Sequence, residues 1–274
     1  MRLKLGRQTM RLDVFLSEKG LVKSRETAKR MIAEGGVSVN GDIVTKPSKE
    51  ISEGDDVKLC APLPKYVGRG GLKLEKALGC FDISVNGLVC MDIGASTGGF
   101  TDCMLQNGAE YVYAVDVGHS QLDESLVNNS RVKNMEGVNI KDVSPSDFDR
   151  EIGFISTDVS FISLKKVIPK ISELLCENGR AVMLVKPQFE CGRADIGKNG
   201  IVRSEKVHKA VLGDIISFCG QYGLSVMGAD FSPIQGGDGN IEYLISAQKS
   251  GIAGTPIDCA KIISEAHRSF KKGK

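Results

Sequence analysis

The sequence predicts an α/β protein: a mostly parallel sheet whose last strand is antiparallel, preceded by a small α+β domain. Apolar runs typical of strands alternate with amphipathic helical segments through residues 69–274, a pattern typical of a parallel sheet covered by helices. The last two runs have only a turn-rich stretch between them, so they should pair antiparallel. A stretch with two prolines, residues 61–68, separates this region from the compact pattern of residues 1–60 and is expected to be a linker.

The composition is that of a globular protein. Of the 274 residues, 41% are hydrophobic and 26% are charged. The longest charge-free stretch, residues 215–229, is too short to span a bilayer, which needs about 20 apolar residues, so we expect no stable membrane insertion. The eight cysteines form no C-x-x-C pair and the three histidines are scattered. We therefore expect reduced thiols in a cytoplasmic protein and no metal site.

The first 60 residues predict two short helices and a hairpin. Ser24 is a good N-cap for the second helix, and Gly35 and Gly36 should end it. Asn40 and Gly41 form a strong hairpin-turn signal. The apolar positions that predict the helices are Leu12, Phe15 and Leu16 in the first and Ala28, Met31 and Ile32 in the second. The predicted hairpin covers residues 37–44, and a further strand covers residues 57–59.

The large domain is predicted to have six strands with helices before or between them. The expected strands are residues 88–93, 111–115, 154–156, 181–185, 224–227 and 243–245. The expected helices are residues 72–78, 100–106, 164–175 and 206–219. In an open sheet of this kind, ligands bind outside the carboxyl ends of the parallel strands, so residues at those ends are the candidates for function.

Basic residues concentrate in the small domain. The formal net charge is only +2, but residues 1–65 hold 13 basic and 9 acidic residues, whereas residues 66–274 hold 23 and 25. This asymmetry indicates an arm that binds an anionic partner. Lys23, Arg25, Lys29 and Arg30 cluster along the second helix, where they could contact phosphates. A solvated helix face is the alternative reading of such a cluster.

The spacing of Arg11-Leu-Asp13, Gly20, Ser24-Arg25, Ala28, Ile32 and Gly36-Val-Ser-Val-Asn-Gly41 resembles the S-four-type RNA-binding domain over about residues 9–60. The resemblance implies that RNA is the partner. Backbone contacts of this kind position a partner and do not read its sequence. The candidate RNA-binding residues are Arg11, Lys23, Ser24, Arg25, Lys29, Arg30 and, after the linker, Arg69.

A turn rich in small residues, Met91-Asp-Ile-Gly-Ala-Ser-Thr-Gly-Gly-Phe100, follows the first apolar run and opens a helix. Small residues let the backbone approach a ligand closely, and the first helical amides are free to bind it. The spacing is not the G-x-G-x-x-G of dinucleotide binders. The acid that leads it, Asp92, suits a cationic ligand or a sugar hydroxyl better than a pyrophosphate. A purely structural turn is the alternative.

A second acid, Asp116, ends the next apolar run and is placed to bind ribose hydroxyls. Together with the turn, it fits S-adenosylmethionine, which has a ribose, an amino-acid moiety and a sulfonium but no phosphate. Further along, Asn139 and Asp142 are candidates to face an adenine, although an ordinary loop is equally compatible. The candidate cofactor-binding residues are Asp92, Gly94, Ser96, Thr97, Gly98, Gly99, Phe100, Asp116 and Asn139.

Polar residues also stand at other strand ends of the large domain. Asp158 and Lys186 each follow a predicted strand and should converge near Asp92 and Asp116. The antiparallel last strand should bring Glu242 to the same edge. With Lys73, which lies upstream of the first strand, they resemble the Lys-Asp-Lys-Glu tetrad of the FtsJ family, RNA methyltransferases that modify ribose 2′-hydroxyls. The resemblance implies the catalytic set Lys73, Asp158, Lys186 and Glu242.

Over roughly residues 9–248 the chain resembles the TlyA family, whose members carry the name haemolysin but resemble rRNA 2′-O-methyltransferases. The matching segments are Tyr66-Val-Gly-Arg-Gly-Gly-Leu-Lys-Leu74, Asp92–Phe100, Asp158-Val-Ser-Phe-Ile-Ser163, Val185-Lys-Pro-Gln-Phe-Glu190 and Gly197-Lys-Asn-Gly-Ile-Val-Arg203. The family's usual serine before the linker arginine is Gly68 here. The resemblance implies a methyltransferase that acts on ribosomal RNA or ribosomal subunits. A membrane-active haemolysin and a non-catalytic RNA-binding protein are the alternatives.

The charges suggest a division of roles. A ribose hydroxyl is a poor nucleophile, so the enzyme must align it and help remove its proton. A lysine acts as a base only if its pKa is lowered, by desolvation or by a neighbouring cation. We expect Lys73 to be that second cation, Lys186 the base and Asp158 its partner, with Lys73 and Glu242 positioning the ribose. The polar segment 189–203 is predicted to be either a lid ordered by RNA or a mobile surface loop.

Overall fold

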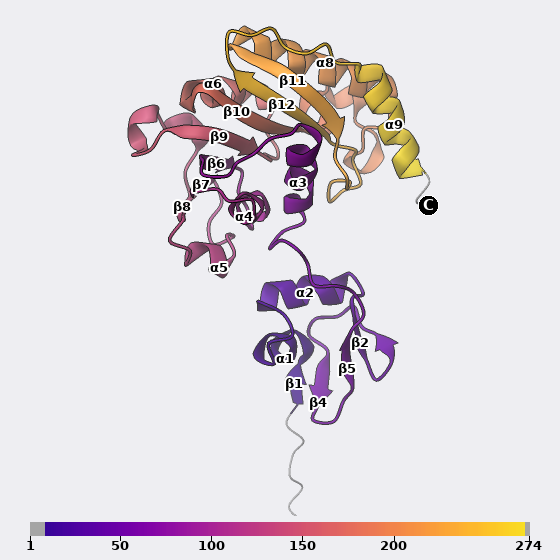
Figure 1. The fold of residues 1–274 in the computed structure, drawn as a ribbon. Helices are drawn as coiled ribbons and strands as arrows, with labels where there is room; N and C mark the ends of the chain where they lie inside the picture. The colour runs from indigo at the N-terminus through magenta and orange to yellow at the C-terminus, as the bar shows by residue number, and fades with distance from the viewer. Residues whose placement is uncertain (1–8, 272–274) are drawn as a thin grey trace, which may run out of the picture. The chain divides into compact units, whose positions relative to one another are not determined.

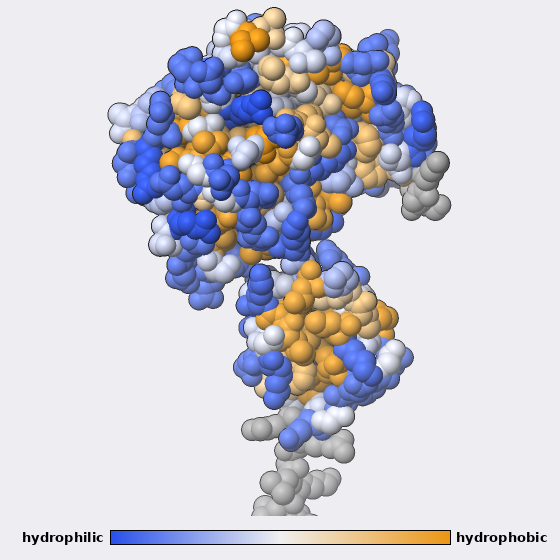
Figure 2. Space-filling model, in the orientation of Figure 1, coloured by the Kyte–Doolittle hydropathy of each residue, from blue (hydrophilic) through white to orange (hydrophobic). Residues whose placement is uncertain are grey.

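The computed structural model describes residues 9–271. The chain divides into two compact units, residues 1–65 (unit 1) and residues 66–274 (unit 2). Each unit has buried apolar residues of its own, one cluster in unit 1 and two in unit 2. Figure 2 shows apolar side chains gathered on the displayed face of unit 1, whereas hydrophilic side chains dominate the displayed face of unit 2.

Unit 1 is a small α+β fold (Figure 1). Its elements are β1 (Thr9–Arg11), α1 (Leu12–Glu18), α2 (Arg25–Ala33), β2 (Val37–Val39), β3 (Asp42–Ile43), β4 (Glu50–Ser52) and β5 (Val57–Leu59). Strands β1 and β4 pair antiparallel, and β3, β2 and β5 form a second antiparallel sheet. The core is formed by apolar residues of both helices and of the strands, among them Leu12, Leu16, Ile32 and Val37.

The local signals of unit 1 act as predicted. The Ser24 hydroxyl accepts a hydrogen bond from the Thr27 amide at 3.2 Å and caps α2. Gly35, at φ +76°, follows the end of this helix in the left-handed region that favours glycine. Asn40 and Gly41 also have positive φ, 55° and 90°, and they connect β2 to β3 as the hairpin turn.

Unit 2 contains a seven-stranded sheet in the order β11-β12-β10-β9-β6-β7-β8. The strands are β6 (Val89–Ile93), β7 (Tyr111–Asp116), β8 (Val132–Glu136), β9 (Ile152–Thr157), β10 (Leu175–Val185), β11 (Leu224–Phe231) and β12 (Tyr243–Lys249). Neighbours from β10 to β8 run parallel, and β12 is antiparallel to both β10 and β11. The predicted fold class, with an antiparallel last strand, is confirmed.

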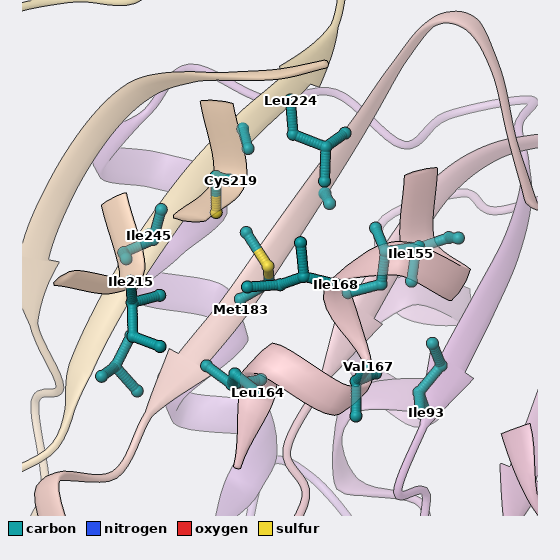
Figure 3. Packing of buried hydrophobic residues seen from close by; sticks show 14 of the residues in the cluster. Ile93, Ile155, Leu164, Val167, Ile168, Met183, Ile215, Cys219, Leu224 and Ile245 are labelled. Carbon is teal, nitrogen blue, oxygen red and sulfur yellow. The ribbon is translucent and has the colours of Figure 1, made fainter. Parts of the chain in front are cut away.

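Helices cover both faces of this sheet. They are α3 (Gly70–Cys80), α4 (Gly99–Gln106), α5 (Glu124–Val127), α6 (Ile168–Leu174), α7 (Pro187–Glu190), α8 (Glu205–Gln221) and α9 (Cys259–Lys271), with 3₁₀ turns at Ile140–Asp142, Pro145–Asp147, Leu164–Lys166, Arg193–Asp195 and Lys198–Gly200. Successive residues of β10 point to opposite faces: Met183 packs with α6, α8 and α9, and Leu184 packs with α3 and α4. Figure 3 shows the first of these cores around Met183 and Ile168.

One strand and three helices of unit 2 were not predicted, each for a physical reason. Strand β8 lies at the edge of the sheet and its residues are half-buried or exposed, so the apolar signal is weak. Helices α5 and α7 have only four residues each. Helix α9 is amphipathic and buries Ile263, Ala266 and His267, but it follows the last strand, outside the alternating pattern. The single helix expected over residues 164–175 is a 3₁₀ turn followed by α6, because Pro169 starts a new helix.

The charge-free stretch 215–229 contributes to the core of unit 2. It comprises the end of α8, a turn and most of β11, and Ile215, Cys219 and Leu224 in it are fully buried. Among residues 9–271, no helix has both the length and the apolar character that a membrane crossing needs. All eight cysteines, which lie in this described part, are free thiols.

A buried cluster of polar rings joins α8, β12 and α9. His208 Nε2 lies 3.0 Å from the carbonyl oxygen of Val202, so this nitrogen carries the hydrogen and donates it. His208 Nδ1 is then an acceptor, and the Tyr243 hydroxyl donates to it at 2.6 Å. His267 Nε2 is 3.1 Å from the same Nδ1 atom. This arrangement suits a neutral His208, and burial together with the neighbouring His267 lowers the pKa of His208 to about 4.

We expect acid to destabilise the fold through His208. Its pKa is about 4 in the folded state and 6.5 in an exposed histidine, so between these values only the unfolded chain binds the proton. The free energy of unfolding should therefore fall as pH decreases from about 6.5 to about 4. Denaturant titrations should give a flatter pH profile for His208→Gln than for wild type, while the exposed His119→Gln control follows wild type. Parallel profiles for wild type and His208→Gln would contradict this assignment.

Candidate active site

The four residues of the predicted tetrad meet at one edge of the sheet in unit 2. Asp158 follows β9, Lys186 follows β10, Glu242 precedes the antiparallel β12, and Lys73 lies in α3. Lys186 Nζ is 2.5 Å from Asp158 Oδ1. Lys73 Nζ is 3.4 Å from Asp158 Oδ2 and 2.7 Å from Glu242 Oε2. The parallel strand ends and the reversed last strand bring these residues together, as the topology predicts.

The tetrad is a chain of alternating charge. In order of contact it runs Glu242, Lys73, Asp158, Lys186, and all four side chains are at least four-fifths buried. Ser160 extends it, because its hydroxyl lies 2.8 Å from Lys186 Nζ. Buried charges require such pairing, since removing an ion from water is costly.

Two carboxylates determine the charge state of Lys73. Burial alone would lower the pKa of Lys73, but the carboxylates of Asp158 and Glu242 outweigh it and raise that pKa above its ordinary value. Burial raises the pKa of Glu242, and Lys73 opposes that rise. Lys73 is therefore a well-neutralised ammonium group. Lys73 lies near Lys186 as a second cation, as expected, and the Asp158 carboxylate contacts both lysines. Whether Lys73 lowers the pKa of Lys186 stays a prediction.

The glycine-rich turn lies against Asp158. Gly94 has φ +84°, and a Cβ atom there would lie 2.7 Å from the backbone oxygen of Asp158. The Asp158 amide donates to the carbonyl of Ile93 at 3.0 Å. Gly98, at φ +89°, faces packing instead of the site, because a Cβ atom there would overlap Leu126. The turn therefore approaches the tetrad closely at Gly94 and packs closely on α5 at Gly98.

Two adjoining cavities open beside this turn. The smaller, of about 210 Å³, is lined by Gly70, Gly94, Ala95, Ser96, Thr97, Gly99, Phe100, Asp158, Ser160 and Lys186. The larger, of about 410 Å³, is lined by Ile93, Gly94, Ser96, Val115, Asp116, Val117, Gln121, Val138, Asn139, Ile140, Asp158, Val159, Ser160, Phe161, Ile162 and Val167. They share Gly94, Ser96, Asp158 and Ser160. Most of the predicted cofactor residues therefore line one or both of these cavities, and Lys186 lines the smaller one.

Asp92 does not line either cavity. Its side chain is fully buried, and its Oδ2 atom accepts hydrogen bonds from the amide and the hydroxyl of Thr101 at 2.9 and 2.7 Å. The Ser156 hydroxyl lies 3.3 Å from Oδ1. Burial raises the pKa of Asp92 to about 7, against the hydrogen bonds of Thr101. The structure thus corrects the prediction of a direct ligand contact: Asp92 ties the start of α4 to the sheet.

Asp116 and Asn139 both line the larger cavity, and their contact with a cofactor stays a prediction. Asp116 accepts from the amides of Ser96 and Gly118 at 2.8 and 2.7 Å, so it fixes the turn and still offers lone pairs to the larger cavity. Asn139 is exposed at the opposite wall, and its side chain accepts from the Lys141 amide. Asp142 does not line the cavity. Gln121, which the sequence argument missed, also lines it and accepts from the Ser96 hydroxyl at 3.2 Å.

An exposed aromatic ring at this edge was also missed. Phe161 is 91% exposed and has φ +62°, which is unusual for a bulky residue. Its ring centroid lies 5.2 Å from that of Phe189, three residues after Lys186. Phe161 stands in the matched segment Asp158–Ser163, but nothing in a sequence shows that a phenylalanine will be exposed.

The polar segment 189–203 is held at both ends. The Glu190 carboxylate accepts from the Ser163 hydroxyl and the Leu164 amide at 2.6 and 2.7 Å. The Asn240 side chain accepts from the Val202 amide and donates to the Gly200 carbonyl, both at 3.0 Å. Residues 192–195 and 197–200 between these anchors are exposed, including Arg193 and Lys198.

The predicted RNA-binding residues of unit 1 lie around the start of α2. Arg11 and Arg25 both contact the carboxylate of Asp13, and their side chains are 46% and 50% exposed. Ser24 caps the helix and Lys23 is exposed just before it. Two other predicted residues lie further along α2: Lys29 pairs with Glu26, and Arg30 is half-buried. The last predicted RNA-binding residue, Arg69, belongs to unit 2, where it is exposed next to the cavity residue Gly70.

Comparison with known proteins agrees with this arrangement. The profile of FtsJ-like methyltransferases matches residues 66–249, and that of the S4 domain matches residues 10–57. The chain is 46% identical to a protein of Bacillus subtilis named as rRNA methyltransferase YqxC, covering 96% of both chains. It is 35% identical to the 16S/23S rRNA (cytidine-2'-O)-methyltransferase TlyA of Mycobacterium tuberculosis, covering 86% of this chain and 88% of the relative.

Two further relatives carry the other family name. Hemolysin A of Brachyspira hyodysenteriae is 45% identical and covers 86% of this chain and 98% of its own. A solved structure of a protein named as a hemolysin from Streptococcus thermophilus has a TM-score of 0.78 at 47% identity, covering 97% of this chain and 98% of that chain. The chain therefore belongs to the TlyA family, in which an S4 domain precedes an FtsJ-like RNA 2′-O-methyltransferase domain.

Proposed function

We propose that the protein methylates the ribose 2′-hydroxyl of a cytidine in ribosomal RNA, with Lys186 as the base. The observation that carries the proposal is the buried Lys186–Asp158–Lys73–Glu242 chain beside two cavities that share lining residues. RNA is the substrate class because it offers the 2′-hydroxyl that DNA lacks. The cytidine follows the names of the TlyA relatives. Ribosomal RNA as substrate also supports action in the cytoplasm.

The family's methyl donor, S-adenosylmethionine, fits the residues present. Asp116 and Gln121 offer oxygen and amide groups for ribose hydroxyls, and apolar side chains of Val138, Ile140 and Ile162 line the same cavity for a base. Gly94 and Ser96 line both cavities and Gly99 lines the smaller one, and these small residues leave room for the amino-acid moiety. When bound there, the cofactor supplies an electrophilic methyl group on a sulfonium sulfur.

The residues of the chain then have separate tasks. Asp158 and Ser160 fix the amine of Lys186 from two sides. Lys186, after its ammonium group has released one proton, takes the proton of the ribose hydroxyl on Nζ. The ribose oxygen gains the methyl group, and the electron pair of the broken methyl–sulfur bond stays with the sulfur as a neutral thioether. Lys73, which lines neither cavity, remains an ammonium group held by Asp158 and Glu242, and it helps to position the ribose by fixing the Asp158 carboxylate. Asp92 acts indirectly, by holding α4 and the glycine-rich turn in place.

The direct test is methyl transfer in vitro. Purified protein, S-adenosylmethionine labelled in its methyl group, and ribosomal subunits from cells that lack the protein should give labelled RNA. After nuclease digestion, the label should lie in 2′-O-methylcytidine. Label in a base would overturn the proposal. Label in the ribose of another nucleoside would overturn only the assignment of cytidine.

Phe161 is proposed to stack on a base of the bound RNA. Its exposed ring lines the larger cavity and rests on Phe189. Stacking of one base on an aromatic ring contributes about 1–3 kcal/mol. Phe161→Ala should therefore raise the KM for RNA at least about fivefold, and Phe161→Tyr should restore it. A loss of S-adenosylmethionine affinity in Phe161→Ala, with the KM for RNA unchanged, would contradict this role.

A further inference from the structure

The carboxylate of Asp13 in unit 1 is shared by two arginines. Arg11 donates through Nε to Asp13 Oδ1 at 2.9 Å and through Nη2 to Oδ2 at 3.1 Å. Arg25 donates through Nε to Oδ2 at 2.9 Å. Asp13 has no exposed side-chain surface, whereas about half of each arginine side chain is exposed. The buried Asp13 carboxylate thus holds two partly exposed arginine side chains in place.

The hydrogen bonds to Asp13 fix the orientation of both guanidinium groups. Each group has five N–H donors in one plane. Asp13 takes two donors of Arg11 and one of Arg25, in each case including Nε. The remaining donors have no partner among residues 9–271. Because Nε of both groups and Nη2 of Arg11 bind the buried acid, Nη1 of Arg11 and both Nη atoms of Arg25 are left for a ligand.

The chemistry of this surface selects a phosphodiester. A guanidinium group matches the oxygens of a phosphate with two parallel hydrogen bonds. Two arginines and one aspartate leave one positive charge, and exposed Lys23 precedes the same helix. Arg25 is the first residue of α2, whose amino-terminal end also attracts anions. An arginine that is already held loses less conformational entropy on binding than a free one.

We propose that Asp13 is a positioning residue that holds Arg11 and Arg25 as a preformed fork for phosphates of the RNA backbone. The inference rests on the proposed function, because it takes RNA as the ligand of unit 1. It goes beyond that function in giving Asp13, an acid, a favourable role in binding a polyanion.

Whether replacement of Asp13 strengthens or weakens RNA binding distinguishes this positioning role from a simple effect of net charge. Removing a negative charge near a phosphate site should strengthen RNA binding if only net charge matters. If Asp13 positions the arginines, its removal should weaken binding although the surface becomes more positive. Glu26 provides a matched control, since it follows Arg25 on α2, pairs with Lys29 and contacts neither arginine of the fork.

The experiment compares Asp13→Asn, Arg25→Lys and Glu26→Gln in the full-length protein. Dissociation constants for a 23S rRNA transcript are measured over a series of salt concentrations. Thermal unfolding and S-adenosylmethionine affinity report whether each variant is folded. Arg25→Lys keeps the charge and leaves the Asp13–Arg11 pair, so it tests the fork even if Asp13→Asn fails to fold.

We expect Asp13→Asn and Arg25→Lys to bind the transcript at least about tenfold more weakly than wild type, which corresponds to one charge-assisted hydrogen bond. The salt dependence should fall by about one ion for each phosphate that the variant no longer binds. Glu26→Gln should bind as tightly as wild type or more tightly. A folded Asp13→Asn that binds like Glu26→Gln would overturn the inference, as would wild-type affinity in Arg25→Lys. Failure of the proposed function would look different, because wild type itself would then not methylate RNA.

Discussion

Replacing Lys186 with alanine is expected to abolish methyl transfer while the protein still binds S-adenosylmethionine. The ammonium group of Lys186 contacts Asp158 and Ser160 at the edge of the smaller cavity, and no other lysine or histidine among the described residues lines either cavity. Loss of a general base lowers a rate by about 10²–10⁴-fold. Single-turnover methylation of ribosomal subunits gives the rate, and calorimetry gives the cofactor affinity.

Two further variants separate a base from a positive charge. Lys186→Arg keeps the charge and the hydrogen bonds but cannot accept a proton, because a guanidinium group stays protonated in proteins. It should be as inactive as Lys186→Ala. Lys76→Ala removes another half-buried lysine, paired with Asp230 outside both cavities, and should retain activity. Substantial turnover by Lys186→Arg would show that Lys186 acts through its charge alone.

Replacing Asp158 should damage both stability and activity. Its carboxylate neutralises Lys73 and Lys186, whose side chains are each 9% exposed. In Asp158→Ala two buried ammonium groups face each other with only Glu242 to balance them, and breaking a buried ion pair costs about 3–5 kcal/mol. Urea unfolding should show a loss of that order. Asp158→Asn, which keeps an acceptor oxygen, should lose less.

The control for this prediction is Asp230→Ala. Asp230 pairs with Lys76, but both side chains are more exposed than those of the tetrad, at 26% and 21%. Its removal should cost less than the removal of Asp158 because water can solvate the remaining charge. Equal losses for Asp158→Ala and Asp230→Ala would mean that the tetrad is not a buried charge network.

The sequence predicted the parts of the fold that depend on local patterns. Alternating strands and helices indicated the sheet and its reversed last strand, and strand ends indicated that Asp158, Lys186 and Glu242 would meet. The assignment of Lys73 depended on the family resemblance, since a lysine in a helix upstream of the sheet has no local signal. The edge strand β8 and helix α9 were missed because the first is half-exposed and the second follows the regular pattern.

The partners of charged residues could not be predicted in the same way. Asp92 and Asp116 both stand at strand ends, yet one is fully buried on Thr101 and the other lines the cavity. Asp13 belonged to the recognised motif, but its shared pairing with Arg11 and Arg25 depends on how α1 and α2 pack. The three-dimensional partner of a charge decides its role, and sequence spacing does not give that partner.

The central claim is best tested by mapping 2′-O-methyl groups in ribosomal RNA by mass spectrometry. RNA is compared from cells with the protein, cells without it, and cells complemented with wild type, Lys186→Ala or Lys76→Ala. We predict that at least one 2′-O-methylcytidine disappears without the protein and returns with wild type and Lys76→Ala but not with Lys186→Ala. Identical ribose methylation in all of these samples would contradict the account.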